Sequence, residues 1–584
     1  MGFVLFWLAA SYVFYRRYPP NFNDPNFYAE DGSVFARNLA DKGFFSAMLT
    51  TFNGYYIWGL YLLEQAGRIL NGIFFGGEFV HLAKSLALTS YLFLGFVVTL
   101  PLLLFRKYFP LPVLLLISLF LLFVPLRDYD YAIIGGIGNL KFAFIFIGFL
   151  LLVYRHLMPE DSKKVYLVDA GILICAYTNI TVYALMPFAL LRYMPKLRRR
   201  RWTELKEDRS FVSLVVLGLL LLPQLLVMKL HGVPEIAGYL DAPFNYARTV
   251  EIFLSRSYLY GLAFPFNKYL NDAVVILLLA VLFVPLLIKT RRTRAILLFG
   301  LLAVAFSTVL FVTKRTGVSD LYSGYQSGGP DQFFYAQNWM IYFVLGISLY
   351  EVLKSARRPV RFGALGAAAV LLLVFIPKAG TYGNNSFMAD SVGIIYANAK
   401  QACDNNDPLP DLAIYPSPGL EYEDIDRQVL CTETVKQYRP ENLSLGLAPA
   451  DNNYISGLGS ENSFTQTFVS PHEFLAGISV YFSTFDRTVR SPYDLVLYDA
   501  SCTRELAVVH IPTTKLRDNA FYGLDFQPQA GSAGKTYCFS ILAKSEQPEP
   551  LAVQLSQPDM YSEGQTRLND ELIARDIVFK LAYE

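Results

Sequence analysis

The stretch that decides the fold is Ser85–Phe105, which reads SLALTSYLFLGFVVTLPLLLF and contains no charged residue. A helix needs about 20 mainly apolar residues to cross the hydrocarbon core of a bilayer, so this stretch is predicted to be a transmembrane helix. The whole chain has 584 residues and is 54% hydrophobic, 15% aromatic and 17% charged, which favours a membrane protein. Other runs of similar length and apolarity are also predicted to span the bilayer: 111–126, 211–228, 273–288, 295–313 and 362–377.

Shorter apolar runs complete the predicted set of spans. Residues 2–14, 142–154 and 339–353 have membrane-like flanks and are included as spans. The run 166–193 is apolar but interrupted, so it is either one long kinked helix or two short helices that form a hairpin. The interrupting residues are Thr178, Asn179, Thr181 and Pro187.

Basic residues between the spans predict the orientation. Because cytoplasmic loops are enriched in Lys and Arg, the clusters belong inside: Arg106–Lys107, Arg155 with Lys163–Lys164, and residues 196–201, 289–294 and 354–361. This threading places the N-terminus inside and gives about eleven crossings. It leaves outside the C-terminal part and four stretches: 15–84, 127–141, 229–271 and 314–337.

One basic pair disagrees with this orientation. Arg16–Arg17 follows the first span and would lie outside. The pair reflects either a weakly biased first helix or two cations that meet a lipid phosphate.

The C-terminal part changes in character. After a loop-rich connecting region at 379–463, residues 464–584 show short alternating runs typical of an all-β sandwich or jelly roll. The chain is therefore predicted to contain an α-helical polytopic membrane domain at 1–378, with an external loop at 15–84, followed by an external β-sandwich. The expected strands are 475–482, 493–498, 506–510, 520–526, 536–542 and 551–555.

Four cysteines lie in the expected external part. Cys403, Cys431, Cys502 and Cys538 allow three disulfide connectivities, and pairing neighbours closes the shortest loops. An oxidising compartment fits this placement. Isolated His81 and His231 have no second ligand at metal-site spacing, so no zinc site is predicted.

The first external loop holds the most informative motif, Phe27–Gly32, which contains the adjacent carboxylates Glu30 and Asp31. A base just outside the membrane could take the proton of an acceptor hydroxyl as that hydroxyl attacks a lipid-linked sugar. Asp31 is equally suited to cap a helix that runs to about Asp41 and stops at Gly43. A helix N-terminus also favours an ionised carboxylate, so the two roles are compatible in part.

This arrangement resembles the GT-C class of integral-membrane glycosyltransferases. The likeness rests on the acidic pair, the surface helix expected within 57–75, the many spans and the external C-terminal domain. In detail it covers about 30 residues, from Tyr28 to Tyr56, including Phe35 and Gly54–Tyr56. The resemblance implies that Asp31 is the catalytic base, with Glu30 as the second candidate.

A departing polyprenyl phosphate needs cationic partners, and Arg can pair two phosphate oxygens at once. Lys314 and Arg315 open the fourth external stretch and are the first candidates, with an interfacial anchor as the alternative. Arg16 and Arg17 are further candidates. In the second stretch, Arg127, Asp128 and Lys141 surround Gly135–Gly138 and form either an acceptor or phosphate loop or a plain turn.

The sequence thus favours an inverting glycosyltransferase whose partners are a polyprenyl-phosphate sugar, a glycan acceptor such as lipopolysaccharide O-antigen, and the bilayer. The net charge of +2 gives no reason to expect a nucleic acid. Glu30–Asp31 could hold Mg²⁺ or Mn²⁺, but no cofactor is assigned. The predicted location is a bacterial inner membrane with the C-terminal domain in the periplasm. The alternatives are a transporter or flippase of lipid-linked sugar and a glycan-binding subunit of a polysaccharide-synthesis complex.

Overall fold

The computed structural model divides the chain into two compact units. The first comprises Met1–Asn23, Val34–Ile73 and Ser85–Gly383, and the second comprises Asp24–Ser33, Phe74–Lys84 and Asn384–Glu584. The structure describes residues 2–23, 25, 31–78, 81–124, 133–160, 162–231, 243–258, 291–313, 333–355, 357–378, 412–413, 421–422, 442–444, 449–456, 458, 462–485, 487–516, 518–545, 549, 551–558, 561 and 564–583.

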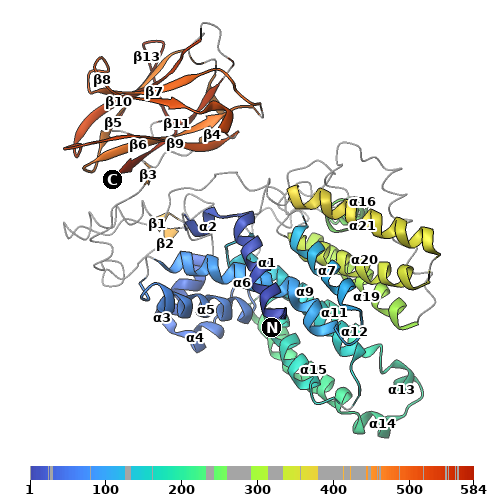
Figure 1. Ribbon diagram of the computed structural model, residues 1–584. Coiled ribbons are helices and arrows are strands. Elements are labelled where there is room, and N and C mark those ends of the chain that lie inside the picture. Colours follow the sequence, from blue (N-terminus) through green and yellow to red (C-terminus); the bar gives the residue numbers. More distant parts are fainter. Residues whose placement is uncertain are drawn as a thin grey trace. The chain divides into compact units, whose positions relative to one another are not determined.

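The first unit is helical (Figure 1). Within the described residues, five helices are long and apolar enough to cross a membrane, as expected for a membrane protein. They cover Leu82–Phe105, Gly138–Leu157, Arg209–His231, Thr293–Thr313 and Arg358–Pro377. They correspond to α6, η4 (Gly138–Phe142) with α9 (Ala143–Leu157), α15, α19 and α21.

The full set of about eleven crossings is not established. Helix α7 (Leu111–Phe123) has 13 residues, fewer than the expected run of 111–126. Helices α1 (Gly2–Arg17) and α20 (Tyr335–Ser355) also form, whereas the expected span 273–288 lies outside the described residues.

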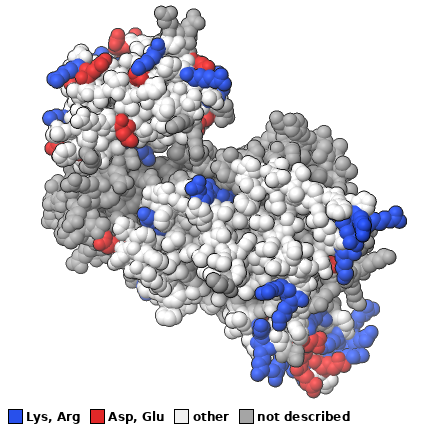
Figure 2. Space-filling view, in the orientation of Figure 1, with Lys and Arg blue, Asp and Glu red and all other residues white. Residues whose placement is uncertain are grey.

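Apolar side chains cover the outside of several helices. Helix α21 (Arg358–Lys378) is mostly exposed, and α15 (Arg209–His231) and α19 (Arg291–Thr313) expose many leucine and valine side chains. Figure 2 shows a broad surface of the helical unit with few charged residues. In water such a surface would be unfavourable, so it is suited to lipid.

The interrupted run 166–193 forms a hairpin. Helix α10 (Val165–Ala176) ends just before Thr178, and the shorter helices α11 (Thr181–Leu185) and α12 (Pro187–Leu190) follow. Both arms of the hairpin reach the same partner, because Asp169 near the start and Tyr193 near the end both accept hydrogen bonds from Arg155. The chain therefore returns to the end from which it started.

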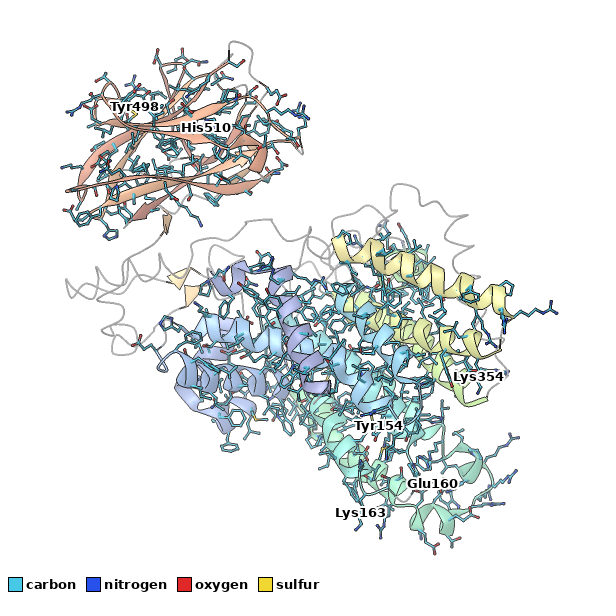
Figure 3. The ribbon with its side chains drawn as sticks, viewed as in Figure 1. Tyr154, Glu160, Lys163, Lys354, Tyr498 and His510 are labelled. Carbon is cyan, nitrogen blue, oxygen red and sulfur yellow. A yellow bond between two sulfur atoms is a disulfide. The ribbon has the colours of Figure 1, made fainter. Side chains whose placement is uncertain are left out.

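Charged groups at this end form ion pairs, one buried and another nearer the surface. Arg155 of α9 (Ala143–Leu157) is buried and makes two hydrogen bonds with Asp169, at 2.7 and 3.2 Å. Glu160, in the loop after α9, is half exposed and pairs with Lys196 at 2.9 Å (Figure 3). These contacts join the end of α9 to the base of the hairpin.

Helix α5 (Trp58–Phe74) has the reverse of the usual amphipathic pattern. Glu64 and Asn71 are buried, whereas Ile69, Ile73 and Phe74 are exposed. An apolar outer face and a polar inner face are suited to a helix at the bilayer interface. This is consistent with the surface helix predicted within 57–75.

The second unit contains a two-stranded antiparallel sheet, made of β1 (Leu412–Ala413) and β2 (Glu421–Tyr422), and two larger antiparallel sheets. The six-stranded sheet has the order β13-β12-β5-β10-β7-β8. The seven-stranded sheet has the order β14-β11-β6-β15-β3, with β4 beside β11 and β9 beside β6. The strands of the first are β13 (Glu571–Ile573), β12 (Thr566–Leu568), β5 (Phe464–Ser470), β10 (Lys535–Ala543), β7 (Tyr493–Asp499) and β8 (Glu505–Ile511). Those of the second are β14 (Arg575–Ile577), β11 (Ala552–Pro558), β6 (Leu475–Ser483), β15 (Phe579–Tyr583), β3 (Asn442–Ser444), β4 (Pro449–Ile455) and β9 (Ala520–Gln529).

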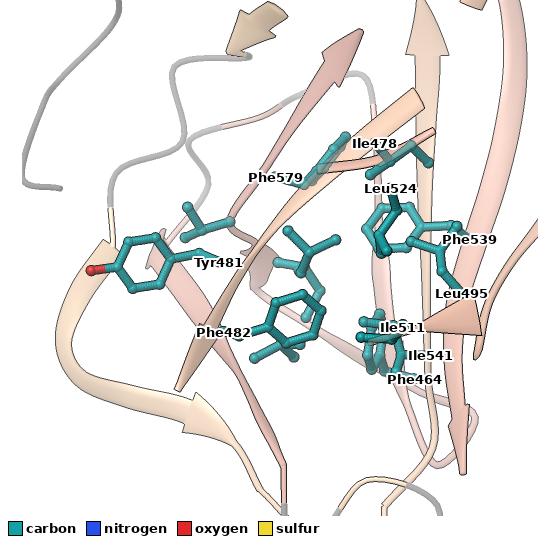
Figure 4. Packing of buried hydrophobic residues seen from close by; sticks show 14 of the residues in the cluster. Phe464, Ile478, Tyr481, Phe482, Leu495, Ile511, Leu524, Phe539, Ile541 and Phe579 are labelled. Atoms are coloured by element: carbon teal, nitrogen blue, oxygen red, sulfur yellow. The ribbon is translucent and has the colours of Figure 1, made fainter. Parts of the chain in front are cut away.

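The two larger sheets enclose one apolar core (Figure 4). Phe579 of β15 contacts Phe468 of β5 and Phe539 of β10, with ring centroids 5.5 and 5.0 Å apart, so these rings join one sheet to the other. The six expected strands are confirmed as β6 to β11. Strands β3 and β4 come from the region expected to be only a connection.

A disulfide joins Cys502 to Cys538 across 36 residues of sequence. Cys538 lies on β10, and Cys502 lies in the turn between β7 and β8. This is one of the two neighbouring pairs expected from the sequence. Cys403 and Cys431 lie outside the described residues, and Cys175 is buried and free.

Candidate functional site

Asp31 begins a helix. It is the first residue of the π-helix η1 (Asp31–Ala36), which continues into α3 (Arg37–Lys42) and stops at Gly43, where φ is +70°. Its side chain is buried, with 2% exposed. The expected helix from Asp31 to about Asp41 is therefore present. The second acidic candidate, Glu30, lies outside the described residues.

Four residues after Asp31, Phe35 packs inside the first loop. Its ring lies 5.6 Å from that of Phe52 and 5.7 Å from that of Tyr61. The Tyr61 hydroxyl accepts a hydrogen bond of 2.9 Å from the Asn38 amide. Burial raises the pKa of Tyr61 to about 12, and nearby Glu64 adds to the rise, so the phenol stays protonated at neutral pH.

A tight turn brings Phe52 into this position. Phe52 and Tyr55 exchange backbone hydrogen bonds of 2.8 and 3.2 Å across Asn53 and Gly54. Both central residues have positive φ, at 51° and 80°, as in two-residue hairpin turns of type I′. Asn and Gly tolerate this backbone conformation best, which explains the Asn-Gly pair before Tyr55.

Lys141 of the second loop meets the first loop at Phe52. Its ammonium nitrogen lies 5.8 Å from the centroid of the Phe52 ring and 5.5 Å from that of Phe142. The hairpin tip holds the backbone here, because the Asn179 amide donates to the Lys141 carbonyl at 3.1 Å. The structure thus places the candidate cation Lys141 in contact with the first loop, which also contains the helix that begins at Asp31. Arg127 and Asp128 lie outside the described residues.

The glycine loop before Lys141 is closely packed. Gly135 has a φ of +98°, and a Cβ there would lie 2.4 Å from the Cβ of Asn21. The Asn21 amide donates to the Ile134 carbonyl at 2.6 Å, and the Gly135 amide donates to the Ser90 hydroxyl at 3.0 Å. These contacts account for glycine at 135 through packing and backbone conformation, in agreement with a plain turn.

A mostly aromatic cluster gathers residues of the third expected external stretch and the two ends of the fourth. It is made of Phe142, Phe244, Ile252, Phe311, Val312, Phe333 and Phe334. Phe333 lies 5.3 Å from Phe142 and 4.8 Å from Phe311, so both ends of the fourth loop meet beside Lys141. Lys314 and Arg315, which open that loop, lie outside the described residues.

A glutamine from a membrane helix fixes the Gly54–Tyr56 motif. The fully buried Gln224 side chain of α15 accepts a hydrogen bond from the Tyr56 amide and donates one to the Tyr56 carbonyl, both at 3.1 Å. Tyr177, at the end of α10, stacks on Trp58 with ring centroids 4.1 Å apart. This pairing could not be predicted from sequence, because Gln224 is 168 residues away from Tyr56.

The two arginines in the last turn of α1 have different environments. Arg17 is buried and donates to the carbonyls of Leu122 and Val124, at 2.7 and 3.1 Å. Carbonyls at a helix C-terminus attract cations, so Arg17 supports the end of α7. Arg16 is exposed. Of the two, only Arg16 presents its charge to the surroundings.

No group of three or more potential metal-binding side chains occurs in the part of the chain that the structure describes. Searches of protein-family models and of curated proteins find no match to this chain.

Proposed function

We propose that this protein is an inverting membrane glycosyltransferase that moves a sugar from a polyprenyl-phosphate donor to a surface glycan or a lipid-linked acceptor. One observation carries the proposal. At one end of the helical unit, Phe52 of the first loop meets Lys141 of the second, and the cluster around Phe142 joins residues of the third loop to the two ends of the fourth. The first loop also carries the acidic candidate, Asp31.

In the proposed reaction, the Asp31 carboxylate accepts the proton of an acceptor hydroxyl. The hydroxyl oxygen forms a bond to the anomeric carbon of the donor sugar, and the bond from that carbon to the phosphate oxygen breaks. The electron pair of that bond leaves with the polyprenyl phosphate. Attack opposite the leaving group inverts the anomeric centre.

The departing phosphate gains negative charge, so a cation near it stabilises the transition state. Lys141 is the described candidate, and its contact with Phe52 sets the position of its ammonium group. Lys314 and Arg315 are candidates from the loop whose two ends meet beside Phe142. Arg16, exposed in the last turn of α1, is a further candidate.

The membrane location supports a lipid-linked donor. Five helices in the described part of the chain are long and apolar enough to cross the bilayer, and α5 exposes an apolar face suited to the interface. The disulfide in the C-terminal sandwich fits an oxidising compartment. We therefore propose a bacterial inner membrane, with the loops of the site and the C-terminal domain on the periplasmic side.

Transfer can be tested with purified full-length protein in vesicles. The vesicles would contain lipid-linked sugars extracted from host cells, together with the surface-glycan fraction of a strain that lacks the gene. Mass spectrometry should detect one added sugar on the glycan with wild type and little with Asp31→Asn. Transfer at an equal rate by both proteins would remove the catalytic role of Asp31.

A second candidate is transport of a lipid-linked sugar. The broken hairpin α10–α12 favours it, because transporters use interrupted helices. In the same vesicles, movement of the labelled sugar lipid between leaflets without transfer would establish transport instead of the transferase.

A further inference from the structure

A cavity of about 550 Å³ lies where the loops after α6 (Leu82–Phe105) and α9 meet. It lies at the opposite end of α9 from Lys141, which belongs to the short helix η4 before α9. Its lining includes Lys107, Tyr108, Tyr154, Met158, Ser162 and Lys164. The proposed transfer reaction uses none of these residues.

The cavity has a surplus of positive charge. Lys107 comes from the loop after α6 and Lys164 from the loop after α9, and both are exposed. Neither lysine forms an ion pair within the described residues, and no described carboxylate lines the cavity. Glu160, the described acid of the second loop, instead pairs with Lys196 at 2.9 Å and with Arg192 at 3.7 Å.

The remaining walls are suited to the boundary between water and lipid. The Tyr154 ring lies 6.1 Å from those of Tyr108 and Phe105, and Leu157 and Met158 provide buried apolar surface. Tyrosine is favoured at this boundary because its ring is apolar and its hydroxyl is polar. Helices α6 and α9 end beside the cavity, at Phe105 and Leu157. Figure 3 shows Tyr154 and Lys163 toward this end of the helical unit.

We infer that this cavity binds the phosphate of an anionic phospholipid headgroup. Two ammonium groups from separate loops can donate to phosphate oxygens, and such charge-assisted hydrogen bonds are strong. Basic pockets at the ends of membrane helices on the cytoplasmic side are suited to anionic headgroups. The mixed lining gives the polar headgroup and the first carbons of its chains suitable surroundings.

The neighbours of the two lysines provide a matched control. Arg106 and Lys163 are exposed, carry the same charge and adjoin Lys107 and Lys164, but they do not line the cavity. The double variants Lys107→Gln/Lys164→Gln and Arg106→Gln/Lys163→Gln therefore change the net charge equally. All four side chains lie at the surface, so both variants should fold.

Native mass spectrometry of the full-length protein would measure binding of phosphatidylglycerol and phosphatidylcholine. Wild type should prefer phosphatidylglycerol, and the Lys107/Lys164 variant should bind it roughly ten- to thirtyfold more weakly. The Arg106/Lys163 variant should stay within about twofold of wild type. Equal loss in both variants, or no preference for the anionic lipid in wild type, would overturn the site.

Competition distinguishes the two sources of phosphate. Inorganic phosphate at millimolar concentration should leave bound phosphatidylglycerol in place, because it lacks the contacts made by the glycerol and the chains. If it displaced the lipid from wild type but had no effect on the Lys107/Lys164 variant, the assignment to a lipid would be wrong and the ligand would be a soluble phosphate.

Discussion

Replacing Asp169 by asparagine is expected to destabilise the helical unit by about 3–5 kcal/mol, the usual cost of removing one partner from a buried ion pair. The Arg155 side chain is 2% exposed and that of Asp169 is 7% exposed. Asparagine keeps the size of the side chain but removes its charge, and its NH₂ group would face the guanidinium donors. The Arg155 charge would then stay buried without its counter-ion.

The remaining partners of Arg155 are too weak to compensate. They are the Ser210 carbonyl at 2.6 Å and the Tyr193 hydroxyl at 3.3 Å, both uncharged. Removing both charges leaves no buried charge without a counter-ion. Arg155→Met/Asp169→Leu should therefore recover most of the stability lost by Asp169→Asn. The Tyr193 hydroxyl would keep its 2.6 Å hydrogen bond to Ser210.

Thermal unfolding in detergent, followed by tryptophan fluorescence, would compare these proteins. Glu160→Gln is the control, because the Glu160 side chain is 52% exposed and its loss should change stability by no more than about 1 kcal/mol. An Asp169→Asn protein as stable as wild type would refute the reasoning. A double variant no more stable than the single one would also refute it, because removing the second charge would then bring no recovery.

Three further predictions concern the first loop, the sandwich and the candidate cation. Gln224→Leu leaves the Tyr56 backbone without its buried partner, which should lower the free energy of unfolding by about 1–3 kcal/mol. Limited proteolysis should then cut the first loop faster, and unchanged cleavage would contradict this. Changing Cys502 and Cys538 to serine should destabilise the sandwich by about 2–4 kcal/mol, measured as a lower midpoint of chemical unfolding, and an unchanged midpoint would argue against the bond. Lys141→Gln should lower the rate of transfer in vesicles by about 10²–10³-fold with folding preserved, and an unchanged rate would remove Lys141 from the site.

The strongest sequence signals were long apolar runs and short alternating runs rich in strand-forming residues. The run 85–105 became α6, and the run 475–482 became β6, most of whose side chains are buried. The Thr178–Asn179 interruption also had structural meaning, since α10 ends just before it and a hairpin follows.

Long-range pairing could not be predicted from sequence. Gln224 looks like a single polar residue in an apolar helix until its contact with Tyr56 is known. Strand β3 has only three residues and is stabilised by pairing with β15, more than 130 residues later, so its own pattern is too short to identify it.

The candidate site was predictable in part. The acidic pair and Lys141 were singled out by residue type. The helix that starts at Asp31 also forms as predicted and stops at Gly43. The contact between Phe52 and Lys141 was not predictable, because it depends on an Asn-Gly turn in one loop meeting a residue about 90 positions later.

The most direct test of the transferase proposal is the surface-glycan composition of cells that lack the gene. Mass spectrometry would compare cells complemented with wild type, Asp31→Asn or Glu30→Gln at matched membrane expression. Restoration of a sugar by wild type but not by Asp31→Asn is the predicted result. Full restoration by Asp31→Asn would mean that Asp31 only begins a helix and that its catalytic assignment is wrong.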